Sequence, residues 1–99
     1  MRKVVAVTAA FLALAAGQAW AQDARYMAAV CANCHGTDGK AVSGGAVAGL
    51  AGLSRSYFIE QMTAFKTDKR RATIMHQIAK GFTDQQIAVL ADYFSAQKK

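Results

Sequence analysis

Two cysteines and a histidine lie within five consecutive residues of this chain, in the order Cys31-Ala32-Asn33-Cys34-His35. The spacing CxxCH is the attachment sequence of a c-type haem. Two thiols separated by two residues on a helical turn can each add across one vinyl group of the same porphyrin, and the following histidine then lies under the iron as its proximal ligand. The motif therefore predicts one covalent haem c, bound through Cys31, Cys34 and His35.

Three other kinds of site use a CxxC pair. A thioredoxin-like dithiol is expected within a βαβ pattern, and no strand-like alternation surrounds residue 31. A structural zinc ion usually needs four nitrogen or sulfur ligands, and only His76 remains beyond His35. A disulfide between Cys31 and Cys34 suits an exported chain but leaves His35 unexplained. Haem attachment is the interpretation that uses all three residues.

The start of the chain is typical of a secretory signal peptide. Arg2 and Lys3 precede an apolar stretch over residues 4–16, and Ala19-Trp20-Ala21 matches an A-x-A cleavage site. About 13 apolar residues are too few for a membrane span, which needs about 20. We expect cleavage after Ala21, so that residues 1–21 are a signal peptide and the mature protein is periplasmic, without a membrane span.

Residues 22–99 then form one small monohaem domain. Its 78 residues are few for an independent core, so the haem is expected to serve as a staple around which short helices pack. The whole chain has a formal net charge of +6; Arg2 and Lys3 supply two of these charges, which leaves +4. This balance favours docking to an acidic protein surface and is too weak to indicate a nucleic-acid partner.

The apolar spacing predicts an all-α domain of about four short helices. Asp23 is a candidate N-cap for the first helix, which ends in CxxCH, and Thr83-Asp-Gln-Gln86 is typical of a capping box at the start of the last. Between them we expect a helix capped by Ser54 or Ser56, and another over about residues 70–80, with Ile74 facing inward, that stops at Gly81. Six of the eight glycines fall in residues 36–52, which predicts a loop against the haem edge.

The ligand opposite His35 decides between electron transfer and ligand-binding chemistry. Met27 lies in the same helix as the attachment site, and Met62 occupies an ordinary core position of its helix. Met75 lies far enough along the chain to close over the other haem face. His76, its neighbour, points about 100° away and is expected to be an exposed residue near the haem edge. Met75 is therefore the predicted distal ligand, with His76 or an open site as alternatives.

Several segments together resemble the class I c-type cytochromes. They are CANCHGTDG, the small-residue stretch ending in AGLAGL, YFIEQMTAFKTDKR, ATIMHQIAKGF and TDQQIAVLADYFSAQ. Within that class the chain is most similar to the monohaem cytochrome subunit of flavocytochrome c sulfide dehydrogenase, with c4-type and c553-type carriers close behind. The resemblance implies the class I cytochrome c fold, a haem held by Cys31 and Cys34, His35 and Met75 as axial ligands, and a last helix that packs on the first through Tyr93 and Phe94.

One departure from that family concerns the residue before Leu50. The family often has a proline in this loop, whose carbonyl accepts the N–H of the proximal histidine; this chain has no proline, and Ala48 stands there. A backbone carbonyl at Ala48 can still accept this hydrogen bond. Because proline's fixed φ is missing, other contacts must hold the loop.

The resemblance implies that this chain does no bond chemistry itself. It would accept electrons from an FAD-containing sulfide dehydrogenase and pass them to a downstream cytochrome, with the FAD bound only by the partner. A freely diffusing electron carrier is the first alternative, and a haem enzyme or gas sensor with an open sixth site is the second. Lys66, Lys69, Arg70 and Arg71 form a basic run that suits docking, although such a run is usually a solvated face.

Overall fold

The computed structural model describes residues 23–99, and the predicted signal peptide lies outside them. An N-terminal helix runs to residue 35. It is followed by the 3-10 turn η1 and three α-helices: η1 (Thr37–Gly39), α2 (Arg55–Lys66), α3 (Met75–Lys80) and α4 (Asp84–Ser95). No residue from 23 onward is in a strand, so the all-α prediction is confirmed. Within the same range, no helix has the length and apolar character that a membrane crossing requires.

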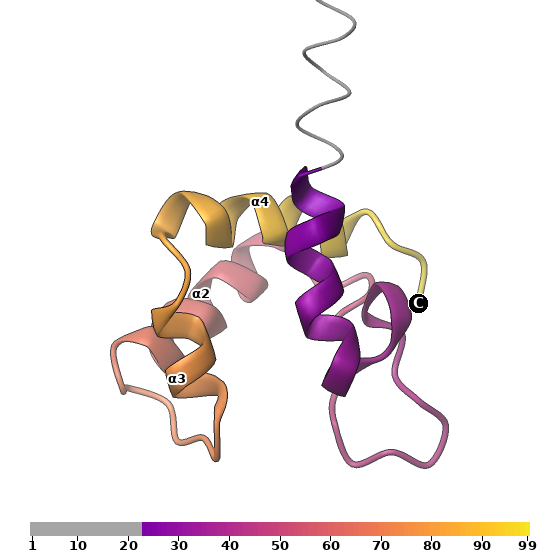
Figure 1. Ribbon diagram of the computed structural model, residues 1–99, viewed down its shortest axis with the longest axis horizontal. Helices are drawn as coiled ribbons and strands as arrows, with labels where there is room; N and C mark the ends of the chain where they lie inside the picture. The colour runs from indigo at the N-terminus through magenta and orange to yellow at the C-terminus, as the bar shows by residue number, and fades with distance from the viewer. Residues whose placement is uncertain (1–22) are drawn as a thin grey trace, which may run out of the picture.

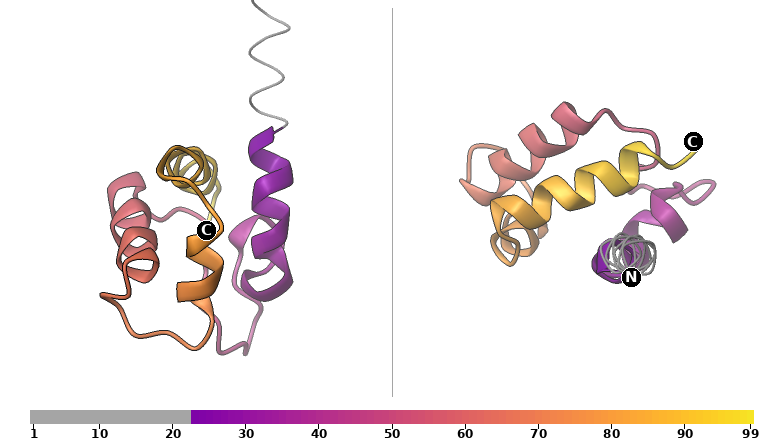
Figure 2. Two further views of the ribbon diagram at one scale, coloured as in Figure 1. Left: turned by 60° about the vertical axis from the view of Figure 1, so that its left-hand side comes forward. Right: turned by 90° about the horizontal axis from the view of Figure 1, so that it is seen from above.

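The helices form an arch with α4 across its top (Figure 1). Helix α2 lies along α4 on one side and the N-terminal helix crosses α4 on the other, with α3 below α4 and between them (Figure 2). The C-terminal end of the N-terminal helix and the N-terminal end of α3 both point away from α4 (Figure 1). The two helix ends that carry the CxxCH motif and Met75 therefore lie on the same side of the domain.

Local side-chain bonds fix two of the helix starts. The Ser54 hydroxyl accepts a hydrogen bond from the Tyr57 backbone N–H at 3.3 Å and so caps α2. At α4 the Thr83 hydroxyl accepts from the Gln86 N–H at 3.1 Å, and the Gln86 side chain accepts from the Thr83 N–H at 2.9 Å. These bonds satisfy N–H groups that a helix leaves unpaired, and they confirm the predicted capping box. The N-terminal helix already includes Asp23, so the prediction of Asp23 as N-cap is wrong.

Helix α3 is shorter than the sequence indicated. It begins at Met75 rather than near residue 70, and its N-cap, Ile74, makes no capping bond. The backbone N–H groups of Lys69 and Arg70 both donate to the Ala64 carbonyl, so this stretch folds back on the end of α2 instead of starting a new helix. Ile74 is 57 % exposed, which corrects its predicted inward position. Gly81 follows the last residue of α3, as predicted.

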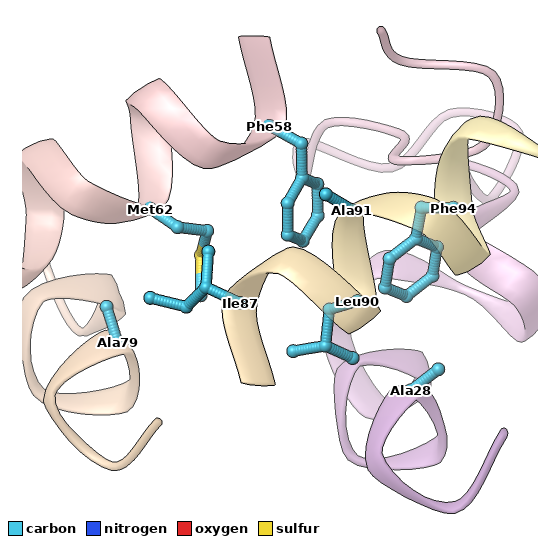
Figure 3. Close-up of a cluster of buried hydrophobic side chains, with 8 residues drawn as sticks. All are labelled: Ala28, Phe58, Met62, Ala79, Ile87, Leu90, Ala91 and Phe94. Carbon is cyan, nitrogen blue, oxygen red and sulfur yellow. The ribbon is translucent and has the colours of Figure 1, made fainter. Parts of the chain in front are cut away.

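The apolar core is centred on α4 (Figure 3). Phe94, Ile87 and Leu90 are its most completely buried side chains. Phe94 stacks on Phe58 of α2, with ring centroids 5.6 Å apart, and Ala28 of the N-terminal helix belongs to the same cluster. Burial of a large apolar side chain contributes roughly 1.5–3 kcal/mol to stability, so α4 holds the other helices in place. The predicted packing of the last helix on the first is confirmed.

Candidate functional site

The two cysteines occupy the last turns of the N-terminal helix. Cys31 is half-buried and packs against the core, whereas Cys34 is exposed, and both are free thiols. Burial raises the pKa of the Cys31 thiol. Both sulfur atoms are available for thioether formation.

His35 ends the same helix, and its ring is held by the loop that follows. Its Nδ1 donates a hydrogen bond to the Ala48 carbonyl oxygen, at 2.6 Å. A carbonyl oxygen is only an acceptor, so Nδ1 carries the proton and Nε2 keeps its lone pair. Histidines that bind metals are typically oriented in this way, with the second nitrogen bonded to a carbonyl. The predicted acceptor at Ala48 is confirmed.

The other metal and thiol interpretations find no support in the fold. Over residues 23–99, no group of three or more histidine, cysteine, aspartate or glutamate side chains is placed to hold a metal ion. A zinc site built from Cys31, Cys34, His35 and His76 therefore does not form. The same stretch is helical or irregular throughout, so the βαβ setting of a thioredoxin-like dithiol is also missing.

The three methionines of the described chain occupy different environments. Met62 is 7 % exposed and belongs to the core between α2 and α4, as expected for a packing residue. Met27 is partly buried against the same core from the helix that bears the attachment motif. Met75 is the first residue of α3 and is half-buried. Of the three, Met75 is the one that begins a helix, α3, and the N-terminal end of α3 lies on the side of the domain where the N-terminal helix ends (Figure 1).

His76 differs from its prediction as an exposed residue. It is half-buried, and its Nδ1 is a buried atom without a hydrogen-bond partner. Its neighbours explain this position, because Met75 is half-buried and Ala79 is completely buried on the same short helix. His76 therefore lies at the border of the buried face of α3 and not on its solvent side.

Several large apolar side chains are exposed around these groups. Val42 and Val47, in the loop after η1, are 64 % and 44 % exposed, and Ile74, which directly precedes Met75, is 57 % exposed. Val30 is 58 % exposed on the helix that ends in the attachment motif. Exposed apolar side chains in these segments are available to a ligand or a partner. Free thiols, an oriented imidazole, a thioether and exposed valines are the chemistry that a haem c requires, so these residues fit the group.

Comparison with known proteins agrees with this chemistry. The sequence profile of the family described as Cytochrome c matches residues 15–98 of the chain. The chain is a member of the cytochrome c family. As a class I c-type cytochrome with a single CxxCH, it carries one covalent haem c.

Relatives of this cytochrome fall into several named groups. It is 38 % identical over 69 residues to the cytochrome subunit of sulfide dehydrogenase from Chlorobaculum tepidum, an alignment that covers 70 % of this chain and 61 % of that protein. Identity to cytochrome c4 from Pseudomonas aeruginosa is 40 %, over 88 % of this chain and 42 % of the relative. Identity to cytochrome c-554(548) from Halomonas halodenitrificans is 34 %, over 69 % of this chain and 84 % of the relative. The cytochrome thus spans less than two thirds of the first two of these relatives.

The basic run after α2 is only partly free for docking. Lys66 pairs with Asp84 at 3.1 Å, and Arg70 donates to the Gln61 side chain while its guanidinium lies 4.6 Å from the Phe65 ring centroid. The remaining members of the run, Lys69 and Arg71, are exposed. Half of the run thus serves the structure of the α2 end, and Lys69 and Arg71 are its candidate docking charges.

One contact near the site has no signal in the sequence. The Tyr93 hydroxyl of α4 donates to the Asp38 carboxylate of η1 at 2.5 Å. Asp38 has φ 53°, in the left-handed region, where aspartate is more common than most residues other than glycine. The bond to Asp38 raises the pKa of Tyr93. The sequence placed Tyr93 only in the packing of the last helix on the first.

Proposed function

We propose that this cytochrome transfers single electrons through a haem with His35 and Met75 as its axial ligands, attached through Cys31 and Cys34. The observation that supports this proposal most strongly is the hydrogen bond from His35 Nδ1 to Ala48, because it leaves Nε2 as the free ligand nitrogen. Met75 also supports the proposal, because it begins α3, whose N-terminal end lies on the same side of the domain as the end of the helix that carries the CxxCH motif.

Each of these residues has a separate task. When bound, the haem iron supplies a one-electron ferric/ferrous couple. The Cys31 and Cys34 sulfurs hold the group to the helix, and His35 donates electron density from Nε2. Met75 offers a thioether sulfur, which favours the ferrous state and a fairly high potential. The exposed Val42 and Ile74 would offer apolar surface to the group.

A test with carbon monoxide separates electron transfer from a haem enzyme or gas sensor. Carbon monoxide binds ferrous iron where the sixth position is open. With Met75 as ligand, the reduced wild-type protein should show little or no binding at neutral pH, and Met75→Ala should bind rapidly and stoichiometrically. Rapid stoichiometric binding by the wild type would overturn the electron-transfer proposal in favour of an open site.

We further propose that the electron donor is an FAD-containing sulfide dehydrogenase and that the acceptor is another cytochrome. The name of the relative from Chlorobaculum tepidum, a cytochrome subunit of sulfide dehydrogenase, supports this partner. The exposed Lys69 and Arg71 would suit an acidic surface on either partner, because opposite charges accelerate encounter. Charge-removing variants Lys69→Gln and Arg71→Gln should slow electron transfer at low salt, whereas Lys98→Gln, at the chain end, should not.

A freely diffusing carrier is the second candidate. The relatives named cytochrome c4 and cytochrome c-554(548) favour a freely diffusing carrier, because neither of these names mentions a flavoprotein. Purification from the native periplasm at moderate salt distinguishes the two candidates. A subunit should co-elute with a yellow flavoprotein whose FAD absorbs beneath the haem bands, whereas a carrier should elute alone. If the haem protein elutes alone, without any flavin, the sulfide dehydrogenase assignment is wrong.

We also propose that residues 1–21 are a signal peptide and that the mature protein is periplasmic. The basic start, the apolar stretch and the Ala19-Trp20-Ala21 site support it. Mass spectrometry of the haem-containing protein from the periplasm should give a chain that begins at Gln22. A haem-containing product that retains Met1 would contradict cleavage.

A further inference from the structure

The loop that presents Ala48 to His35 has few internal bonds. Residues 41–48 are all exposed, and within this stretch one backbone hydrogen bond is found, from the Gly45 N–H to the Val42 carbonyl. The loop has no proline to restrict its φ angles. The Ala48 carbonyl must therefore be held in place from the two ends of the loop.

Both ends of the loop are attached to one place, the C-terminal end of α4. The Gly39 carbonyl accepts hydrogen bonds from the N–H groups of Leu50 and Ala51, at 2.7 and 3.0 Å, which closes the loop at its base. The Gly52 N–H donates to the Phe94 carbonyl at 2.9 Å, and Gly39 lies directly against the Phe94 ring. The base of the loop is therefore held by α4, the helix on which the apolar core is centred.

The Tyr93–Asp38 hydrogen bond is the side-chain link between this base and α4. Asp38 precedes Gly39 and has a left-handed φ of 53°, which aspartate tolerates better than most residues with a Cβ atom and which a contact with another element can stabilise. The Tyr93 hydroxyl, at 2.5 Å from the Asp38 carboxylate, provides that contact. Without this hydrogen bond, η1 would be free to relax. The Gly39 carbonyl that closes the loop would then move together with η1.

We propose that Tyr93 is a positioning residue for the electron-transfer site: through Asp38 and η1 it holds the Ala48 carbonyl against His35 Nδ1. This inference rests on the proposed function of His35 as the proximal ligand. A close carbonyl makes the imidazole a stronger electron donor, which stabilises ferric iron and lowers the reduction potential. Loss of the Tyr93 hydroxyl should lengthen the His35–Ala48 bond and raise the potential.

The variant Tyr93→Phe, made in the haem-containing protein, tests this role because it removes one oxygen and keeps the ring. Two quantities are measured: the reduction potential and the solvent exchange rate of the His35 Nδ1 proton, followed by NMR in the ferrous state. In Tyr93→Phe the potential should rise and the proton should exchange faster, by up to about tenfold, the effect of one lost hydrogen bond.

Two further variants serve as matched controls. Asp38→Asn keeps an acceptor oxygen and tolerates a left-handed φ, so both quantities should stay close to the wild-type values. Thr83→Ala weakens α4 at its other end, so it should lower stability without a change in potential. A merely structural role of Tyr93 would make Tyr93→Phe behave like Thr83→Ala.

The outcomes separate this inference from the proposed function. An unchanged potential and exchange rate in Tyr93→Phe would overturn the positioning role. If the ring protons of His35 lack haem-shifted resonances already in the wild type, His35 is not a ligand, and both proposals are wrong.

Discussion

The imidazole of His35 and the backbone carbonyl of Ala48, 13 residues apart in the chain, are joined by a 2.6 Å hydrogen bond. The bond selects the ring tautomer and leaves Nε2 as the nitrogen with a lone pair. Because the acceptor belongs to the backbone, the side chain at position 48 need not be a proline. The loop must nevertheless keep its shape, and in this cytochrome the end of α4 provides the support.

Gly39 is the tightest point of that support. It has φ +74°, and an added Cβ atom would lie 2.8 Å from both the Leu50 Cβ and the Phe94 Cδ1. Gly44 has φ +75° with no atom within 4 Å of such a Cβ, so it is a matched control for backbone strain alone. We expect Gly39→Ala to lower the free energy of unfolding by roughly 1–3 kcal/mol more than Gly44→Ala. Denaturant unfolding of the two haem-containing variants measures this difference, and equal losses would contradict the packing argument.

The capping box at Thr83 should contribute measurably to the stability of α4. Thr83→Ala removes the acceptor of the Gln86 N–H bond and should lower the free energy of unfolding by about 0.5–2 kcal/mol. Thr63→Ala makes the same chemical change at an exposed position within α2 and should have an effect near zero or slightly favourable. Thermal unfolding followed by circular dichroism checks both variants, and similar losses in the two would argue against the cap.

The hydrogen bond to Asp38 also predicts a pH dependence at the alkaline end. It raises the pKa of Tyr93 above the ordinary tyrosine value of about 10, while Arg25 acts in the opposite direction. The unfolded chain therefore loses this proton at lower pH than the folded chain, and the stabilising effect, complete below pH about 10, falls as the pH rises toward the folded pKa. Wild type should be more stable than Tyr93→Phe at pH 8, and the difference should shrink above pH 10 in denaturant titrations. A difference that is constant with pH would contradict the Tyr93–Asp38 bond.

Local patterns were sufficient to predict much of this fold. The capping residues Ser54 and Thr83 act within one helical turn, so their hydrogen bonds follow from the sequence. The core position of Met62 follows equally from apolar spacing. The CxxCH motif is local as well, whereas the acceptor at Ala48 is implied by the resemblance to class I cytochromes, which often have a proline in the loop before the residue here numbered Leu50.

Contacts between distant segments could not be predicted in the same way. Tyr93 and Asp38 are 55 residues apart, and neither has a spacing that indicates its partner. The sequence predicts a start of α3 near residue 70, whereas the backbone N–H groups of Lys69 and Arg70 bond back to α2. The half-buried position of His76 could not be predicted, because the sequence of a six-residue helix does not distinguish its two flanks.

The most direct test of the central claim is the weak absorption band at the red end of the oxidised spectrum, which arises from sulfur ligation of the iron. It should be measured in Met75→Ala and, as a control, in Met62→Leu, which changes the buried core methionine. With His35 and Met75 as axial ligands, the band disappears in Met75→Ala and remains in Met62→Leu. A band that survives in Met75→Ala would contradict the account.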